Sequence, residues 1–173
     1  MNTILTIFTN RGEVIEEAIQ AIGALASTIE TRFNKYLDKF GPFLIFSLKS
    51  HETQNICKAG TMALGDLSRA LGNVMQPFLY EIIPPLLENL KNPQINTDIK
   101  VQSICTLGDL AGATKEKFLD YMNEVIGFID SAAGASLQPV ELEKDPEMFD
   151  YCLGLREAIL EFYVGLIQGL IEV

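Results

Sequence analysis

The sequence Leu64-Gly65-Asp66-Leu67 returns as Leu107-Gly108-Asp109-Leu110, and these two stretches decide the fold. The copies lie about 43 residues apart. The related stretch Ile22-Gly23-Ala24-Leu25 precedes the first copy by nearly the same interval, and Val164-Gly165-Leu166-Ile167 is a weaker fourth copy. A unit of this length has room for two helices, so the spacing predicts an array of stacked helical pairs.

The glycine in each copy predicts where the stacked helices touch. A glycine inside a helix costs about 1 kcal/mol relative to alanine, so glycines at four matching positions need a compensating benefit. Without a Cβ atom, the second helix of a pair can press against its own partner or against the helix of the next pair. We therefore expect Gly23, Gly65, Gly108 and Gly165 to be close contacts between helices.

Apolar residues recur at spacings of three and four along nearly the whole chain, and alternating β-branched runs are missing. This pattern predicts an all-α protein with helices near 11–29, 31–49, 52–71, 73–91, 95–113, 115–134 and 146–170. The repeat period is typical of a HEAT or armadillo array, which is a right-handed α-solenoid. We expect one segment, 1–173, made of the second helix of a leading repeat (11–29) and repeats at 31–71, 73–113 and 115–170, with an acidic loop at 135–145.

Composition narrows the kinds of partner. The 173 residues include 23 acidic and 13 basic side chains, which gives a net charge of −10. A surface that binds nucleic acid needs clustered Lys and Arg, so the charge argues against that class and favours a basic partner. The longest uncharged stretch, 18–29, is shorter than the roughly 20 residues of a membrane-spanning helix. We expect no binding of nucleic acid and no membrane insertion.

The residue patterns of an enzyme or a cofactor site are missing from the sequence. His51, the single histidine, is expected in a turn with a solvated or capping role. The acidic loop lacks the glycine and the final glutamate that a helix-loop-helix calcium site requires. Cys57, Cys105 and Cys152 are too scattered for a disulfide framework and are typical of a reducing, intracellular compartment. We expect no catalytic residue, no metal and no cofactor.

Two groups of acidic residues are candidates for binding a basic partner. Glu13, Glu16, Glu17, Glu157 and Glu161 occupy the polar sides of their predicted helices. Asp66 and Asp109 follow the repeated glycine; they form either an acidic row or hydrogen bonds between repeats, and their apolar surroundings favour the second.

The chain resembles the HEAT repeats of the importin-β family of nuclear transport receptors, in their middle to C-terminal part. The resemblance runs nearly from end to end and is most specific in these stretches: Ile4 to Phe8, Phe40-Gly41-Pro42-Phe43-Leu44, Gly65 to Leu71, Leu86 to Leu90, and Leu155 to Ala158 followed by Tyr163, Gly165, Gln168, Gly169 and Leu170.

The resemblance implies a transport role without chemistry. In the family, second helices line a concave face that grips basic cargo or the basic helix of the importin-α adaptor, and first helices on the convex face take Phe-Gly nucleoporins. Ran-GTP releases cargo through N-terminal repeats, which this chain lacks, so we expect a fragment or a truncated relative. The implied location is the cytoplasm, the nucleus and the pore of the nuclear envelope.

Residues for both faces follow from the resemblance. The residues expected to bind basic ligands on the concave face are Glu13, Glu16, Glu17, Asp66, Asp109, Glu157 and Glu161. Those expected to line a Phe-Gly groove on the convex face are Phe43, Phe46 and Leu87. The alternative is a HEAT-repeat scaffold subunit of a phosphatase or another signalling assembly, which would lack catalytic residues equally.

Overall fold

The structure is a computed structural model, and it describes residues 15–137 and 144–171. Its helices are α2 (Ile15–Ile29), α3 (Asn34–Leu48), α4 (Gln54–Leu71), α5 (Leu79–Lys91), α6 (Thr97–Thr114), α7 (Met122–Ser136) and α8 (Pro146–Ile171). The short 3₁₀-helices η1 (Glu30–Phe33), η2 (Gly72–Phe78) and η3 (Lys115–Tyr121) lead into α3, α5 and α7. No strand occurs in these two ranges, and the predicted all-α class is confirmed.

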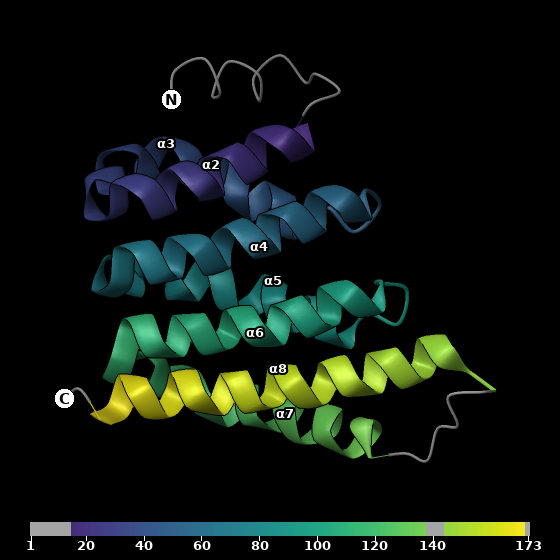
Figure 1. The fold of residues 1–173 in the computed structure, drawn as a ribbon. Coiled ribbons are helices and arrows are strands. Elements are labelled where there is room, and N and C mark those ends of the chain that lie inside the picture. The colour runs from purple at the N-terminus through teal and green to yellow at the C-terminus, as the bar shows by residue number, and fades with distance from the viewer. Residues whose placement is uncertain (1–14, 138–143, 172–173) are drawn as a thin grey trace.

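The helices form two layers that extend along one direction (Figure 1). α2, α4, α6 and α8 lie side by side and form what we call the inner layer; each packs against the next. α3, α5 and α7 form the outer layer behind it. Because the main contacts of each helix pair are with its neighbours along the stack, the molecule is an α-solenoid, as predicted.

The repeated glycines lie where inner helices meet. A Cβ atom added to Gly23 of α2 would lie 2.7 Å from Oδ2 of Asp66 on α4. One added to Gly65 of α4 would lie 2.8 Å from Oδ2 of Asp109 on α6. Each glycine therefore leaves room for the aspartate of the next inner helix.

Between α6 and α8 the backbones themselves meet. A Cβ atom added to Gly108 would lie 2.8 Å from Cα of Phe162, and one added to Gly165 would lie 2.2 Å from the carbonyl oxygen of Gly108. Gly169 is similarly placed, 2.5 Å from the carbonyl oxygen of Ala111. The expected close contacts are confirmed, and they join helices of neighbouring pairs rather than the two helices of one pair.

The outer helices begin later than predicted because a tight turn precedes each of them. Glu30, Gly72 and Lys115 stand at the start of η1, η2 and η3 with φ angles of 50°, 55° and 54°. This positive φ reverses the chain as it leaves an inner helix, and the next residues continue as a 3₁₀-helix. The prediction of uninterrupted helices from 31, 73 and 115 was wrong in this respect.

The core fills the space between the layers. Phe33, Phe40, Phe118 and Phe162 are fully buried, together with leucines and isoleucines of both layers.

The predicted acidic loop was wrong at its start, because Ala135 and Ser136 belong to α7, and its residues 138–143 lie outside the described ranges. Asp145 accepts a hydrogen bond of 3.0 Å from the backbone N–H of Met148, so it caps α8. The division into repeats stays a prediction.

Candidate binding surfaces

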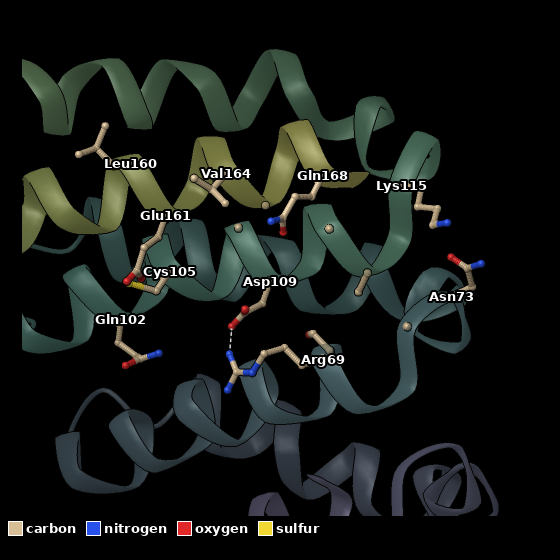
Figure 2. A pocket seen from close by; sticks show the side chains of 16 residues that line it. Arg69, Asn73, Gln102, Cys105, Asp109, Lys115, Leu160, Glu161, Val164 and Gln168 are labelled. Atoms are coloured by element: carbon tan, nitrogen blue, oxygen red, sulfur yellow. Dashed lines mark hydrogen bonds and ion pairs between the residues drawn. The ribbon is translucent and has the colours of Figure 1, made fainter. Parts of the chain in front are cut away.

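A groove crosses the inner layer between α4, α6 and α8, with a cavity volume of about 890 Å³ (Figure 2). Charged and amide side chains alternate with small residues along it, because the close packing of these helices leaves glycine at several lining positions. Its lining residues that matter below are Arg69, Gln102, Cys105, Asp109, Lys115, Leu160, Glu161 and Val164. We call it the inner groove.

Arg69 connects two inner helices at the edge of the inner groove. Its Nη2 donates a hydrogen bond of 2.6 Å to Oδ1 of Asp66, three residues earlier on α4, and its Nη1 donates to Oδ2 of Asp109 on α6. Asp66 and Asp109 therefore make the internal contacts that their apolar surroundings favoured. They do not form the open acidic row that was the other expectation, because both carboxylates are paired with the guanidinium of Arg69.

The charge around Asp109 remains negative in spite of Arg69. Burial raises the pKa of Asp109 above its ordinary value; Arg69 lowers it, and the carboxylates of Glu161 and Asp66 raise it again. Asp109 thus interacts with two further carboxylates and with one guanidinium, and that guanidinium pairs with Asp66 and Asp109. Lys115, the second cation of the groove lining, lies at the opposite end of the groove from Glu161 (Figure 2). A cation that entered near Asp109 would therefore meet the Glu161 carboxylate, which is not part of the Arg69 contacts.

Cys105 and Glu161 meet on the wall of the inner groove, as their adjoining side chains in Figure 2 show. Burial, followed by a hydrogen bond and charge repulsion from the Glu161 carboxylate, raises the pKa of Cys105 to about 12. The thiol is therefore protonated at neutral pH and is a poor nucleophile. The groove provides charge and hydrogen bonding for non-covalent binding.

The other predicted acidic residues are spread along the stack. Glu157 is exposed on α8, one turn before Glu161. Glu16 is half-buried on α2, where Gln20 donates a hydrogen bond of 3.3 Å to it, and Glu17 is exposed. α2 packs on α4, and two inner helices, α4 and α6, separate it from α8, so Glu16 and Glu17 do not line the inner groove. Glu13 lies outside the described residues.

The outer layer carries a second groove, between α3 and α5. It consists of two hollows of about 370 Å³ and 570 Å³ that share Ile45 and Glu81 in their walls. The smaller hollow also contains Pro42 and Phe78, and the larger contains Tyr80 and Pro84. We call the two together the outer groove.

The three residues predicted for this groove do not line it. Leu87 is 1% exposed and belongs to the core, so its assignment was wrong. Phe43 is half-buried against the core, and Phe46 is 59% exposed but lines neither hollow. The hollows are lined instead by the prolines within α3 and α5, of which Pro42 and Pro84 are exposed and Pro85 is buried.

His51 makes a tertiary contact that the sequence analysis missed. Its Nε2 lies 3.0 Å from Oδ1 of Asn89, a buried residue of α5, and Nδ2 of Asn89 is 3.5 Å from Oγ of Ser103 on α6. The predicted solvated or capping role was therefore wrong: His51 ties the α3–α4 turn to the next helix pair. No local pattern could have shown this contact, because the partners are 38 residues apart.

Two other classes of site were searched in the part of the chain that the structure describes. No group of three or more His, Cys, Asp or Glu side chains is placed there to hold a metal ion. None of the helices described combines the length and the apolar character needed to cross a membrane.

Comparison with known proteins identifies the family. The family model for importin subunit beta-1-like proteins, TPR repeats, matches residues 1–173. Importin subunit beta-1 of Arabidopsis thaliana is 34% identical over 170 residues, which cover 98% of this chain and 19% of that protein.

Solved structures agree. A crystal structure of importin beta in an ammonium sulfate condition matches with a TM-score of 0.87 and 29% identity, covering 97% of this chain and 19% of that one. The Kap95:Nup1 complex shares the fold, with a TM-score of 0.80 and 22% identity over 99% of this chain and 20% of that one. The chain thus spans about a fifth of the length of its relatives, and it belongs to the importin subunit beta-1 family.

Proposed function

We propose that this chain acts in nuclear protein import and holds a basic segment, from cargo or from the importin-α adaptor, in the inner groove. The carrying observation is the arrangement at Asp109, beside a cavity of about 890 Å³. The carboxylates of Asp66 and Glu161 both act on Asp109 there, and the Arg69 guanidinium pairs with Asp66 and Asp109. Glu161 points into this groove from α8 and would pair with a lysine or arginine of the guest. The chain's net charge of −10 favours such a partner at longer range.

Binding of a basic peptide to the whole 173-residue protein tests this proposal. We expect a lysine- and arginine-rich signal peptide to bind with a salt-dependent affinity, and Glu161→Gln to weaken binding several-fold. Asp130→Asn is the matched control, because Asp130 is exposed on α7 of the outer layer. Equal loss in both variants, or binding no stronger than that of a scrambled peptide of the same charge, would contradict a defined site.

We further propose that the outer groove takes phenylalanine side chains of Phe-Gly nucleoporins. Its support is chemical: Ile45, Pro42 and Phe78 provide an apolar lining, and the two adjoining hollows suit two side chains of one extended segment. Tyr80, which is 65% exposed, stands at the rim of the larger hollow.

A comparison of the variants Tyr80→Ser and Phe46→Ser tests whether the outer groove binds Phe-Gly peptides. Both side chains are largely exposed, at 65% and 59%, so neither change disturbs the core. We expect Tyr80→Ser to weaken capture of a Phe-Gly peptide and Phe46→Ser to leave it unchanged, because Phe46 lines neither hollow. If Phe46→Ser weakened capture of the peptide and Tyr80→Ser did not, Phe46 would be a binding residue, as the sequence analysis expected, and the outer groove would be excluded as the binding site.

In a longer protein, these two surfaces would work in the cytoplasm, the nucleus and the nuclear pore, with Ran acting through other repeats. Membership of the importin subunit beta-1 family favours this transport role over a phosphatase scaffold. We also propose the division into a leading second helix and three repeats, 31–71, 73–113 and 115–170, on the basis of the repeated glycine contacts and positive-φ turns.

A further inference from the structure

Three prolines lie inside the outer helices that form the outer groove. Pro42 is within α3, and Pro84 and Pro85 follow each other within α5. A proline has no N–H, so it cannot donate to the carbonyl of the residue four positions earlier, and its ring clashes with that carbonyl. The main-chain carbonyls that lose their helix partner in this way belong to Asp38, Tyr80 and Glu81.

The residues that carry these carbonyls border the outer groove. Asp38 lies in the wall of the smaller hollow together with Pro42. Tyr80 lies in the wall of the larger hollow together with Pro84, and Glu81 lies in the walls of both. Each hollow is therefore bordered by main-chain acceptors that their own helix does not satisfy.

The side chains around the larger hollow add more acceptors than donors. The Tyr80 hydroxyl donates a hydrogen bond of 2.6 Å to Oε1 of Glu81. The imidazole Nε2 of His51 lies 3.0 Å from Oδ1 of Asn89. Lys49 adds a cation to this wall, but the two glutamates of the same wall add carboxylate oxygens. A guest with hydrogen-bond donors therefore fits the hollow better than one that brings further acceptors.

These carbonyls restrict which apolar guest can fill the groove. A phenyl ring that enters a hollow displaces solvent from the carbonyls at its border, and an acceptor covered by apolar surface without a hydrogen bond weakens binding. A phenylalanine side chain has no donor of its own. The guest must therefore supply N–H groups from its main chain, beside the rings.

The need for main-chain donors identifies the conformation of the guest. A helix uses nearly all its N–H groups internally, whereas an extended segment can donate them, as a peptide does when it adds to the edge of a sheet. A glycine beside each phenylalanine favours the contact, because it has no Cβ atom to hold the two backbones apart. A second copy of this chain fits less well, because its described segments are mainly helices, which have spare N–H groups only in their first turns.

We propose that the outer groove holds an extended Phe-Gly segment by its main chain, through hydrogen bonds from peptide N–H groups to the carbonyls of Asp38, Tyr80 and Glu81. The proposal rests on the proposed binding of Phe-Gly nucleoporins in this groove and adds a preference for an extended main chain. The hollows take the rings. Pro42, Pro84 and Pro85 act as positioning residues, because they keep the carbonyls out of the helix hydrogen bonds.

A pair of synthetic peptides tests the proposal on the intact chain. The first contains two Phe-Gly pairs, and the second is the same peptide with each Phe and Gly nitrogen methylated. Both keep the phenyl rings, and only the first keeps the N–H groups. We expect methylation to weaken binding to the parent at least about fivefold, which corresponds to the loss of one or two hydrogen bonds of ordinary strength.

The variant Pro42→Ala/Pro84→Ala shows whether the prolines are responsible. Each alanine supplies the N–H that the carbonyl of Asp38 or Tyr80 lacks, so both carbonyls regain their helix hydrogen bonds. We expect this variant to bind the unmodified peptide several-fold more weakly, and methylation to cost less affinity in it than in the parent. This non-additivity separates the hydrogen bonds from the apolar surface of the proline rings. Pro85 is kept because it is buried.

Pro93→Ala is the matched control. Pro93 is exposed in the turn after α5 and lines neither hollow, so this variant should bind both peptides like the parent. Thermal unfolding completes the comparison: Pro42→Ala/Pro84→Ala should unfold at no lower temperature than the parent, because alanine suits a helix interior better than proline. Weaker binding by a variant of at least equal stability is then not due to damage to the fold.

The outcomes separate this proposal from the one on which it rests. If the unmodified peptide does not bind the parent, the outer groove does not take Phe-Gly segments and both proposals are wrong. If it binds and methylation changes nothing, or costs as much in Pro42→Ala/Pro84→Ala as in the parent, the groove binds the rings alone and only the main-chain contact is overturned. Equally tight binding of a helical peptide that presents two phenylalanines one turn apart would also overturn it.

Discussion

Gly165 of α8 lies directly over Gly108 of α6, so closely that a Cβ atom on Gly165 would be 2.2 Å from the Gly108 carbonyl oxygen. No flexible side chain stands at this contact that could move aside, because the atoms on both sides belong to backbone. The contact therefore fixes the separation of two helices that are each needed to form the inner groove.

Gly165→Ala is expected to destabilise the protein by about 1–3 kcal/mol or more, since the added methyl group forces the helices apart. Gly127→Ala is the control. Gly127 lies within α7 with nothing near its missing Cβ, so alanine there should raise stability by up to about 1 kcal/mol through helix propensity. Urea unfolding followed by circular dichroism measures both. A neutral Gly165→Ala would show that the contact is looser than described.

The burial of Asp109 makes stability depend on pH. Burial keeps the pKa of Asp109 above its ordinary value of 3.8, so the folded state binds this proton more tightly than the unfolded state. The contribution of Asp109 to stability is therefore largest below pH 3.8 and is lost as pH rises through the folded pKa. Subtracting the unfolding free energy of Asp109→Asn from that of the parent isolates this term, which should fall as pH rises.

Replacing Arg69 by alanine should shift the pH dependence of stability that comes from Asp109. Arg69 lowers the pKa of Asp109, so its removal should raise that pKa and carry the decline in stability to higher pH. Unfolding of Arg69→Ala across pH 4 to 8, compared with Arg69→Ala/Asp109→Asn, measures the shift. A profile identical to that of the parent would show that Arg69 does not influence the Asp109 carboxylate in solution.

Lys115 adopts a backbone conformation that favours glycine. Its φ and ψ are 54° and −133°, nearly those of Gly72 at the preceding turn, 55° and −128°. Such a conformation strains a residue with a Cβ atom by about 1–3 kcal/mol. We expect Lys115→Gly to be more stable than Lys115→Ala, because both lack the lysine side chain and only glycine relieves the strain. Thermal unfolding should show the higher midpoint for glycine; equal midpoints would exclude strain at this turn.

Cys105 should react slowly with iodoacetamide in the folded protein. Its pKa of about 12 leaves little thiolate at pH 8. Glu161→Gln removes the carboxylate that contributes to this raised pKa, so alkylation should become faster, while burial still keeps the pKa above 9.0. Mass spectrometry of the labelled peptides distinguishes Cys105 from Cys57 and Cys152, which are buried. An unchanged rate in Glu161→Gln would show that the thiol and the carboxylate do not interact.

The order and type of helices could be predicted from sequence because apolar spacing and the repeated glycine are local signals. The same signals placed Gly23 and Gly108 at helix contacts correctly. The turns at Glu30 and Lys115 could not be predicted, because neither residue is a usual choice for a positive φ.

The candidate sites were predicted less well because they depend on how helices from different pairs face each other. Glu161 was identified, but its neighbour Cys105 was not, since 56 residues of sequence separate them and only packing of α8 on α6 joins them. Leu87 illustrates the opposite error: an apolar residue of an outer helix carries no mark in the sequence that separates core from groove. The spacing of apolar residues in the sequence predicts which face of a helix is apolar. Which helix packs against that face is determined by the tertiary structure.

The backbone contacts between inner helices have a consequence for the shape of the stack. α6 and α8 approach until glycine meets glycine, whereas α3 and α5 leave hollows of about 370 Å³ and 570 Å³ between them. Each helix pair is thus a wedge that is thin at its inner edge and thick at its outer edge. Wedges stacked in this way bend the array toward the inner layer. The glycines that let the inner helices approach closely therefore also curve the molecule around a partner that lies against that layer.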